Sequence, residues 1–287
     1  MSAASSTMVL LVSCPDRQGI VAAVTNFIAR IHGNIVDLEQ HVAREDQRFF
    51  MRLEFELEGV TVPIQEFPRA FQPVAERFEM EWDLRDPSRR QRMAIGVTRE
   101  SHCLYDILAR CRSGEWNVEV PLVFANREDL RHVAEQFGVP FYVFPITPET
   151  REAQERCELE LLEQERVDFI VLARYMQILS PQFVRRYPHR IINIHHSFLP
   201  AFAGPRPYHA AFERGVKIIG ATSHYVTEVL DDGPIIEQDV VRVSHRDSVE
   251  DMIRKGRDNE KVVLARAIRA HIEHRVIVYR NRTVVFH

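Results

Sequence analysis

In the first 85 residues, segments with the apolar pattern of a strand alternate with segments that have the apolar pattern of a helix. Met8–Cys14 is almost wholly apolar, which predicts a strand, and the turn residues PDRQG then precede a helical pattern over 20–31. The remaining predicted elements are two strands, a helix that contains Pro68 and a last strand, at 33–43, 47–59, 64–78 and 79–85. This order predicts a ferredoxin-like βαββαβ domain over residues 7–85.

Beyond this region the pattern changes to apolar runs that alternate with helices. Residues 86–92 (DPSRRQR) are polar and aperiodic, which predicts a linker. Uninterrupted apolar runs separated by helices are typical of a parallel sheet covered on both faces, so residues 93–287 are expected to form an open, mostly parallel α/β domain. Its predicted strands are 92–98, 119–125, 140–146, 167–173, 190–195, 218–230 and 235–243. Its predicted helices include 102–112, 127–137 and 248–273, and a hairpin with its turn at 280–282 is expected to follow.

Composition narrows the class of partner. The formal net charge is −4, from 37 basic and 41 acidic side chains that are intermixed, so there is no broad electrostatic footprint for nucleic acid or a membrane surface. No segment approaches the length of a membrane span, and no G-x-G-x-x-G or P-loop pattern follows a predicted strand. Four cysteines without a C-x-x-C pair predict reduced thiols rather than disulfides or structural zinc. We therefore expect a cytoplasmic protein that acts on a small molecule.

The stretch IINIHHSFLP at 191–200 places polar side chains in an apolar run. Side chains alternate along a strand, so Asn193 and His195 are predicted on one face, and Ile192, Ile194 and His196 on the other. If the strand ends near His195, Asn193 and His195 lie at the carboxyl edge of the sheet, where open α/β folds bind ligands. His195 is thus the functional candidate and His196 a packing or hydrogen-bonding residue, although a single histidine at a strand end is more often structural.

A second polar feature is the turn VLDDGPII at 229–236, which carries two carboxylates between strand-like runs. Such an aspartate is ordinarily a solvated turn residue, and the alternative is that Asp231 meets His195. His224 is either a partner of that site or a satisfied core histidine.

Two other chemistries compete for these residues. Metal binding by the histidines at 195, 196, 209 and 224 is disfavoured, because adjacent residues of a strand diverge and no H-E-x-x-H pattern is present. A hydrolase with Ser197 as its nucleophile would need a G-x-S-x-G elbow, which the sequence lacks.

Three features in register resemble the N10-formyltetrahydrofolate-dependent formyltransferase fold: INIHHSFLPAF, the position of Asp231 36 residues after His195, and GATSHYVTEVLDDGPIIEQ. The segment before the linker resembles an ACT domain, whose opening loop is similar to CPDRQGIVAAV followed by GNI. The fusion of two such domains, with RYMQILS ahead of the paired histidines, resembles the formyltetrahydrofolate deformylase family over nearly all of the chain. Two residues depart from related patterns: Gln177, where glycinamide ribonucleotide formyltransferases usually have arginine, and Arg127, where many deformylases have Asn-His.

The resemblance implies an enzyme that hydrolyses 10-formyltetrahydrofolate to formate and tetrahydrofolate, which supplies formate for purine synthesis and balances one-carbon pools. It places Asn193, His195 and Asp231 at the catalytic positions. It implies a folate site formed by Met176, Gln177, Ile178, Leu179, Val226, Glu228 and Leu230. It implies a site for a small amino-acid effector formed by Asp16, Arg17, Gln18, Gly19, Asn34 and Ile35. No metal or permanently bound cofactor is expected, and the ACT-like part implies a homo-oligomer.

The three polar residues can supply what hydrolysis of the N10-formyl amide requires. Asn193 can donate an N–H to the developing oxyanion, a contribution of about 3–4 kcal/mol when such a donor is well aimed. His195 can deliver a proton to N10, and Asp231 can favour the charged imidazole and accept a hydrogen bond or a proton from the attacking water. Which residue is the base stays open. Formyl transfer to an amine acceptor and an inactive amino-acid-sensing protein remain the alternatives.

Overall fold

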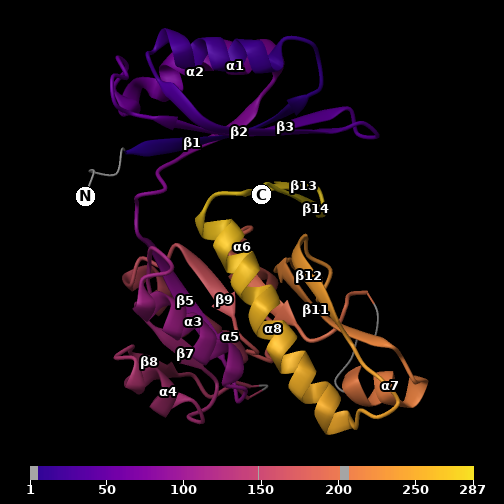
Figure 1. Ribbon diagram of the computed structural model, residues 1–287. Helices are drawn as coiled ribbons and strands as arrows, with labels where there is room; N and C mark the ends of the chain where they lie inside the picture. The colour runs from indigo at the N-terminus through magenta and orange to yellow at the C-terminus, as the bar shows by residue number, and fades with distance from the viewer. Residues whose placement is uncertain (1–5, 148, 201–206) are drawn as a thin grey trace. The chain divides into compact units, whose positions relative to one another are not determined.

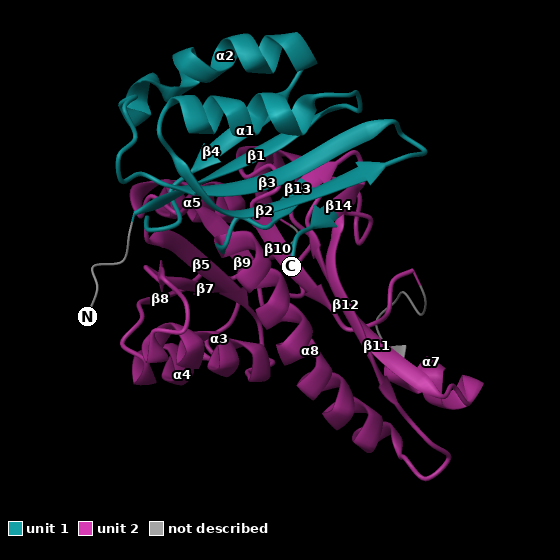
Figure 2. Ribbon diagram, turned by 45° about the horizontal axis from the view of Figure 1, so that its top comes forward, with its two compact units in different colours: residues 1–89, 273–277, 284–287 teal, residues 90–272, 278–283 magenta. Residues whose placement is uncertain are grey.

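The structure is a computed structural model that describes residues 6–147, 149–200 and 207–287. The chain divides into two compact units, which Figure 2 draws in different colours. Unit 1 consists of Met1–Arg89, Glu273–Ile277 and Val284–His287. Unit 2 consists of Arg90–Ile272 and Val278–Thr283.

Unit 1 is a four-stranded antiparallel sheet with two helices on one face (Figure 1). Its strands are β1 (Thr7–Pro15), β2 (Asn34–Ala43), β3 (Arg48–Glu56) and β4 (Glu81–Arg85), in the order β2-β3-β1-β4. Its helices are α1 (Ile20–Arg30) and α2 (Phe67–Phe78), and the short 3₁₀ helix η1 (Ile64–Glu66) precedes α2. The predicted βαββαβ order is confirmed.

Aromatic side chains join these helices to the sheet. Phe27 of α1 packs edge-on against Phe67 and Phe71 of α2, with ring centroids 5.3 and 5.1 Å apart, and Phe55 of β3 stacks on Phe67 at 5.8 Å. Burial of an aromatic side chain of this size stabilises the fold by roughly 2–3 kcal/mol. Pro68 lies in the first turn of α2, where its missing N–H would have had no helical partner, so the helix forms as predicted.

Unit 2 is built on an eight-stranded, mostly parallel sheet, so the predicted fold class is confirmed. Its strands are β5 (Gln91–Val97), β6 (Val118–Glu119), β7 (Val123–Ala125), β8 (Phe141–Val143), β9 (Phe169–Leu172), β10 (Ile191–His195), β11 (Ile218–Tyr225) and β12 (Ile235–Arg242). They lie in the order β12-β11-β10-β9-β5-β7-β8, with β6 beside β5, and only the two pairs that involve β11 are antiparallel among the described strands of this sheet. Its helices are α3 (His102–Ser113), α4 (Arg131–Gln136), α5 (Arg151–Gln164), α6 (Pro181–Arg186), α7 (Pro207–Arg214) and α8 (Val249–Ile272).

The strand order creates a topological switch point between β5 and β9. From β5 the chain moves outward through β7 and β8, and then returns to form β9 on the other side of β5. In open α/β sheets, the crevice outside the carboxyl ends of the strands at such a point is the usual place for a ligand. Here that position lies beyond Val97 and Leu172, beside the end of β10 that carries His195.

Several predicted boundaries differ from the structure. The strands predicted over 140–146 and 218–230 end at Val143 and Tyr225, and three further boundaries differ as follows. β5 begins at Gln91, so the last two residues of the predicted linker 86–92 belong to a strand. The predicted strand 119–125 is two short strands, because Pro121 lies between them and has no N–H to donate to a neighbour. The predicted helix 127–137 is confined to α4, because Arg131 N donates to the carbonyl of Glu128, which is the spacing of a turn.

The end of the chain also differs from the expected domain 93–287. The predicted hairpin forms from β13 (Val276–Tyr279) and β14 (Arg282–Val285), but residues 273–277 and 284–287 belong to unit 1. Within that unit the backbone N–H of His287 donates to the carboxylate of Glu39 at 3.1 Å. A contact between residues 248 positions apart leaves no periodic signal in the sequence.

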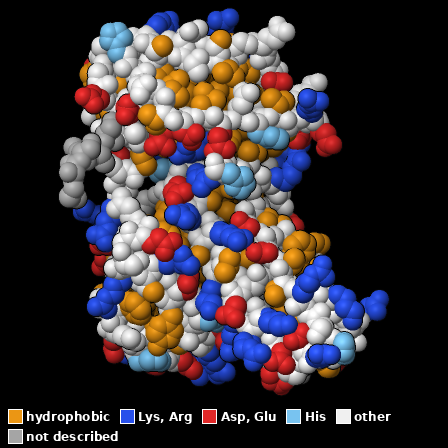
Figure 3. Space-filling view, viewed as in Figure 1, with side chains coloured by type: hydrophobic (Ala, Val, Ile, Leu, Met, Phe, Trp, Pro, Cys, Tyr) orange, Lys and Arg blue, Asp and Glu red, His pale blue; other side chains and the backbone are white. Residues whose placement is uncertain are grey.

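Figure 3 shows Lys and Arg interspersed with Asp and Glu over the visible face of unit 2, as expected for a net charge of only −4. Within the described ranges, no helix combines the length and the apolar character that a membrane crossing requires.

Candidate active site

β10 and β11 bring polar side chains together at the carboxyl edge of the sheet. The antiparallel register pairs Asn193 with His224 and His195 with Thr222, so these four side chains share one face. His195, Thr222 and His224 are buried there. Their functional groups are therefore held by the strand backbone rather than by a loop.

Asp231 reaches this group from the turn after β11. Its φ of 54° is a left-handed conformation that aspartate adopts more readily than most residues, and its Oδ1 lies 3.3 Å from Nδ1 of His195. The hydrogen bond from His195 holds the pKa of the Asp231 carboxyl below its usual value, against the opposing effect of partial burial. The neighbouring Asp232 is exposed. Of the two interpretations of this turn, the contact with His195 is the one that the structure shows.

His224 fixes the orientation of the Asn193 amide. Its Nδ1 lies 3.0 Å from the carbonyl oxygen of Tyr225, and a carbonyl only accepts, so Nδ1 carries the proton. Burial lowers the pKa of His224, which keeps the ring neutral and leaves Nε2 as an acceptor. Nδ2 of Asn193 then donates to Nε2 at 3.2 Å. One N–H of the Asn193 amide is thereby held in place, and the other remains for a ligand.

His195 presents one unengaged ring nitrogen. Nδ1 faces Asp231, whereas Nε2 is buried and has no hydrogen-bond partner among the described residues. A buried ring nitrogen without a hydrogen-bond partner destabilises the fold unless a ligand or a water molecule supplies that hydrogen bond. Nε2 is therefore the atom of this imidazole that can exchange a proton with a bound substrate.

His196 does not point away from His195, and that prediction was wrong. The two rings stack, with centroids 5.2 Å apart and an interplanar angle of 28°. β10 ends at His195, so the alternation of a strand does not extend to the next residue. Burial, followed by the charges of Arg174 and His195, lowers the pKa of His196 to about 4. A neutral His196 adds no second positive charge beside His195 at neutral pH.

The two loops expected to hold the folate follow β9 and β11. Four of their apolar side chains are more than half exposed: Met176, Ile178, Val229 and Leu230. Leu179 is buried in an apolar cluster against which Val226 also packs, so both loops are anchored on the same side chains. Glu228 pairs with Arg185 at 3.5 Å, and Gln177 is partly buried. Neighbouring exposed apolar side chains of this kind are typical of a binding surface.

The residues expected to form the effector site are divided between the two ends of β1. Asp16–Gly19 follow the last residue of β1 and lead into α1. Asn34 and Ile35 open β2, and Asn34 lies level with Thr7, the first residue of β1, because both pair with Glu56. At about 3.3 Å per residue the strand between them is roughly 25 Å long. One copy of unit 1 therefore does not join these residues into a single site, because they flank a helix whose ends lie far apart.

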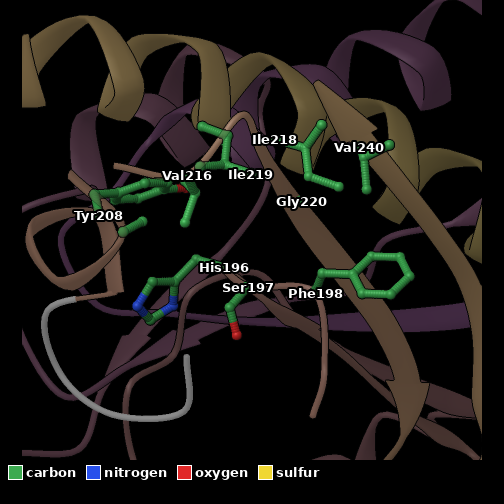
Figure 4. A pocket seen from close by; sticks show the side chains of 10 residues that line it. His196, Ser197, Phe198, Tyr208, Val216, Ile218, Ile219, Gly220 and Val240 are labelled. Carbon is green, nitrogen blue, oxygen red and sulfur yellow. The ribbon is translucent and has the colours of Figure 1, made fainter. Parts of the chain in front are cut away.

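An apolar cavity of about 180 Å³ lies on the other side of the paired histidines (Figure 4). His196, Ser197 and Tyr208 line it together with apolar side chains that include Phe198, Ile219 and Val240. Neither His195 nor Asp231 lines it. The cavity is thus separate from the polar face of β10 on which Asn193 and His195 lie.

One group in the described part of the chain has the ligand spacing of a metal site: His102, Cys103 and Glu260, whose donor atoms lie within 4.8 Å of one another. Both carboxylate oxygens of Glu260 already accept hydrogen bonds at 2.8 Å. Burial raises the pKa of the Cys103 thiol, so it remains protonated. Protons from His102 and Tyr208 and the nearby guanidinium of Arg174 therefore already compensate the Glu260 carboxylate. The group contains none of the four histidines considered from the sequence.

Comparison with known proteins decides the family. Residues 91–268 match the family model described as formyl transferase. A formyltetrahydrofolate deformylase from Synechocystis is 54% identical over 280 residues, with 98% of each chain covered, and one from Bacillus subtilis is 50% identical, with 96% of this chain and 93% of the relative covered. The chain belongs to the formyltetrahydrofolate deformylases. A solved deformylase from Pseudomonas syringae agrees with this membership, with a TM-score of 0.96 and 49% identity over 100% of this chain and 96% of that chain.

Transformylases share the fold of this deformylase family over a smaller part of the chain. A glycinamide ribonucleotide transformylase from Symbiobacterium toebii has a TM-score of 0.65 and 32% identity over 69% of this chain and 95% of that chain. The deformylases match over nearly the full length, whereas this transformylase leaves almost a third of the chain unmatched. The comparisons therefore favour the deformylase function over formyl transfer.

Proposed function

We propose that the chain hydrolyses 10-formyltetrahydrofolate to formate and tetrahydrofolate, and so supplies formate for purine synthesis and balances one-carbon pools. Membership of the deformylase family supports the substrate and the reaction. The structural observation that carries the proposal is the His195–Asp231 pair. It is a buried imidazole with a carboxylate at Nδ1 and an unengaged Nε2.

The proposed roles follow from which atoms are free. The oxygen of a water molecule forms a bond to the formyl carbon while Asp231 accepts a hydrogen bond or a proton from that water. The free N–H of Asn193 donates to the oxyanion that develops. Nε2–H of His195, in its protonated form, donates to N10 as the C–N bond breaks. One proton leaves the water for Asp231 and one passes from His195 to N10, and the proton held by Asp231 then restores His195. The second water proton is released to solvent as formic acid ionises to formate, so the protons balance, and the scheme uses no metal.

A single incubation tests this function. The purified chain is mixed with 10-formyltetrahydrofolate in the absence of any amine, and formate and tetrahydrofolate are measured over time. Equal, catalytic release of both is expected. Turnover only after an amine is added would instead support formyl transfer, and no turnover under either condition would support a binding protein.

We also propose that unit 1 is an ACT-like module through which a small amino acid modulates the rate, in a cytoplasmic homo-oligomer. The resemblance of CPDRQG and GNI to ACT loops supports it. Because Asp16–Gly19 and Asn34 lie at opposite ends of β1, a complete site would need a second copy. A titration of common amino acids against the rate and the melting temperature of the full chain tests the proposal, with Asn34→Ala as the control in which the response should weaken. If no amino acid changes either quantity, unit 1 has no effector role.

A further inference from the structure

A buried cluster of four polar side chains lies next to the paired histidines. Glu260 of α8 is 1% exposed, and it accepts hydrogen bonds at 2.8 Å from the hydroxyl of Tyr208 and from Nε2 of His102. Nε of Arg174 lies 3.7 Å from the same carboxylate. Burial acts to raise the pKa of Glu260, but the hydrogen bond from His102 and the charge of Arg174 hold that pKa below its usual value, so the group is ionised. We call these four residues the Glu260 cluster.

The Glu260 cluster lies at the switch point of the sheet. His102 is the first residue of α3, the helix that follows β5, and Arg174 is the second residue after β9. Tyr208 packs against His196 with ring centroids 6.1 Å apart, and His196 stacks on His195. A continuous series of contacts therefore leads from His195 to Glu260. The Glu260 cluster therefore lies where this fold usually holds a ligand.

The cluster costs stability, which argues against a purely structural role. Nε and Nη1 of Arg174 and Nδ1 of His102 are buried without a hydrogen-bond partner among the described residues, and a buried polar atom left without such a partner destabilises the fold. The cluster also requires Gly256 in the interior of α8, because a Cβ there would lie 2.0 Å from the hydroxyl oxygen of Tyr208. Glycine inside a helix is less favourable than alanine, because it loses more conformational freedom on folding. A well-packed apolar interior would avoid both costs.

We propose that the Glu260 cluster fills the space in which a formyl acceptor would otherwise lie, and thereby leaves water as the only nucleophile that reaches the formyl carbon. This inference rests on the proposed hydrolysis. The transformylase that shares this fold is named for glycinamide ribonucleotide, a substrate far larger than water. In this chain Arg174 and His102 enter the crevice from its two sides and meet at Glu260. They determine specificity by exclusion, and they take no part in the proton transfers.

Opening the crevice should therefore convert part of the hydrolysis into transfer. The nitrogen of a primary amine would form a bond to the formyl carbon, the C–N10 bond would break, and N10 would take a proton as in hydrolysis. The amine would lose one proton to the group that accepts it from water in the wild type. One amide replaces another, so no oxidant or reductant is needed.

Arg174→Ala and His102→Ala open the crevice from opposite sides, and Arg174→Lys is the matched control that keeps the charge and most of the stem. Each full-length variant is incubated with 10-formyltetrahydrofolate labelled in the formyl group and with excess glycinamide. At pH 8 about half of an α-amino group with a pKa near 8 is unprotonated. Formylated glycinamide and formate are then separated and counted. The melting temperature of each variant shows whether it is folded.

The wild type and Arg174→Lys should form formylated glycinamide only at the rate seen without enzyme, and excess glycinamide should not inhibit their formate release. At least one of the two alanine variants should raise the ratio of formylated glycinamide to formate about tenfold or more. The proposal is overturned if the wild type already transfers to glycinamide or is competitively inhibited by it, or if folded alanine variants show no rise. If neither alanine variant folds, the two wild-type measurements still decide. A wild type that releases no formate without amine would instead refute the proposed hydrolysis.

Discussion

Replacing Asp231 by asparagine removes a charge while keeping the shape of the site. Asparagine also tolerates the left-handed backbone at this position, where φ is 54°, so the turn and the folate loops should be preserved. The carboxylate is lost from its place 3.3 Å from Nδ1 of His195. Under the proposed roles, an imidazolium that forms at His195 in the transition state then lacks its counter-charge, and the attacking water loses its acceptor.

The size of the effect follows from this geometry. Two unit charges 3.3 Å apart attract one another by about 5 kcal/mol at an effective dielectric constant of about 20. The Asp231 side chain is 25% exposed, so solvent screening reduces this to roughly 2–3 kcal/mol. Because the imidazolium is needed mainly in the transition state, the loss should appear in kcat as a fall of about 30- to 150-fold.

The assay compares kcat for formate release with the dissociation constant for the folate, measured by calorimetry. Asp231→Asn should lower kcat by this factor and leave folate binding within a few fold. Asp232→Asn is the matched control one residue away, and it should change little because Asp232 is exposed. A kcat for Asp231→Asn within threefold of the wild type, or a larger loss at Asp232, would refute the assigned role of Asp231.

Three further substitutions test other parts of unit 2. Burial raises the pKa of Glu158, which accepts a hydrogen bond from Tyr175, from an ordinary 4.5 to about 7. As the pH rises from 4.5 to 7, Glu158 ionises in the unfolded state before it ionises in the folded state. The free energy of unfolding should therefore fall by up to about 3 kcal/mol over this range. Denaturation at pH 5 and pH 8 should show this fall in the wild type and a much smaller one in Glu158→Gln; an equal fall in both proteins would contradict it. Gly256→Ala should lower the free energy of unfolding by roughly 2–4 kcal/mol, because the new Cβ forces the Tyr208 hydroxyl away from its hydrogen bond to Glu260. This loss should outweigh the better helix propensity of alanine. A denaturation midpoint at or above that of the wild type would exclude it. His224→Phe should reduce kcat about tenfold with folate binding unchanged, because the Asn193 amide, the proposed oxyanion donor, loses the acceptor that orients it. An unchanged kcat would remove His224 from the site.

Local signals in the sequence predicted most of the elements, because strands and helices bury side chains with fixed periods. They also predicted the position of His195 at a strand end. The side chain of His196 could not be predicted in the same way, since the period ends where the strand ends. The sequence left the contact of Asp231 with His195 as one of two alternatives. The composition of a turn does not show toward which face of the sheet its side chains point.

The Glu260 cluster escaped the sequence analysis because its members come from four separate segments, and His102 and Glu260 are 158 positions apart. One signal was present. The helix predicted over 248–273 has a charged residue, Glu260, and a glycine, Gly256, within its buried stripe. A charge in such a stripe requires partners, so it indicates a buried polar group even though it does not name the partners.

The two separate C-terminal segments of unit 1 have a consequence for limited proteolysis. A single cut after Arg89 would leave a fragment of residues 1–89 and a fragment of residues 90–287, yet 273–277 and 284–287 of the second fragment belong to the same compact unit as the first. The hydrogen bond from His287 to Glu39 would then join two chains instead of one. The two pieces should therefore elute together from a sizing column under native conditions and separate only in denaturant.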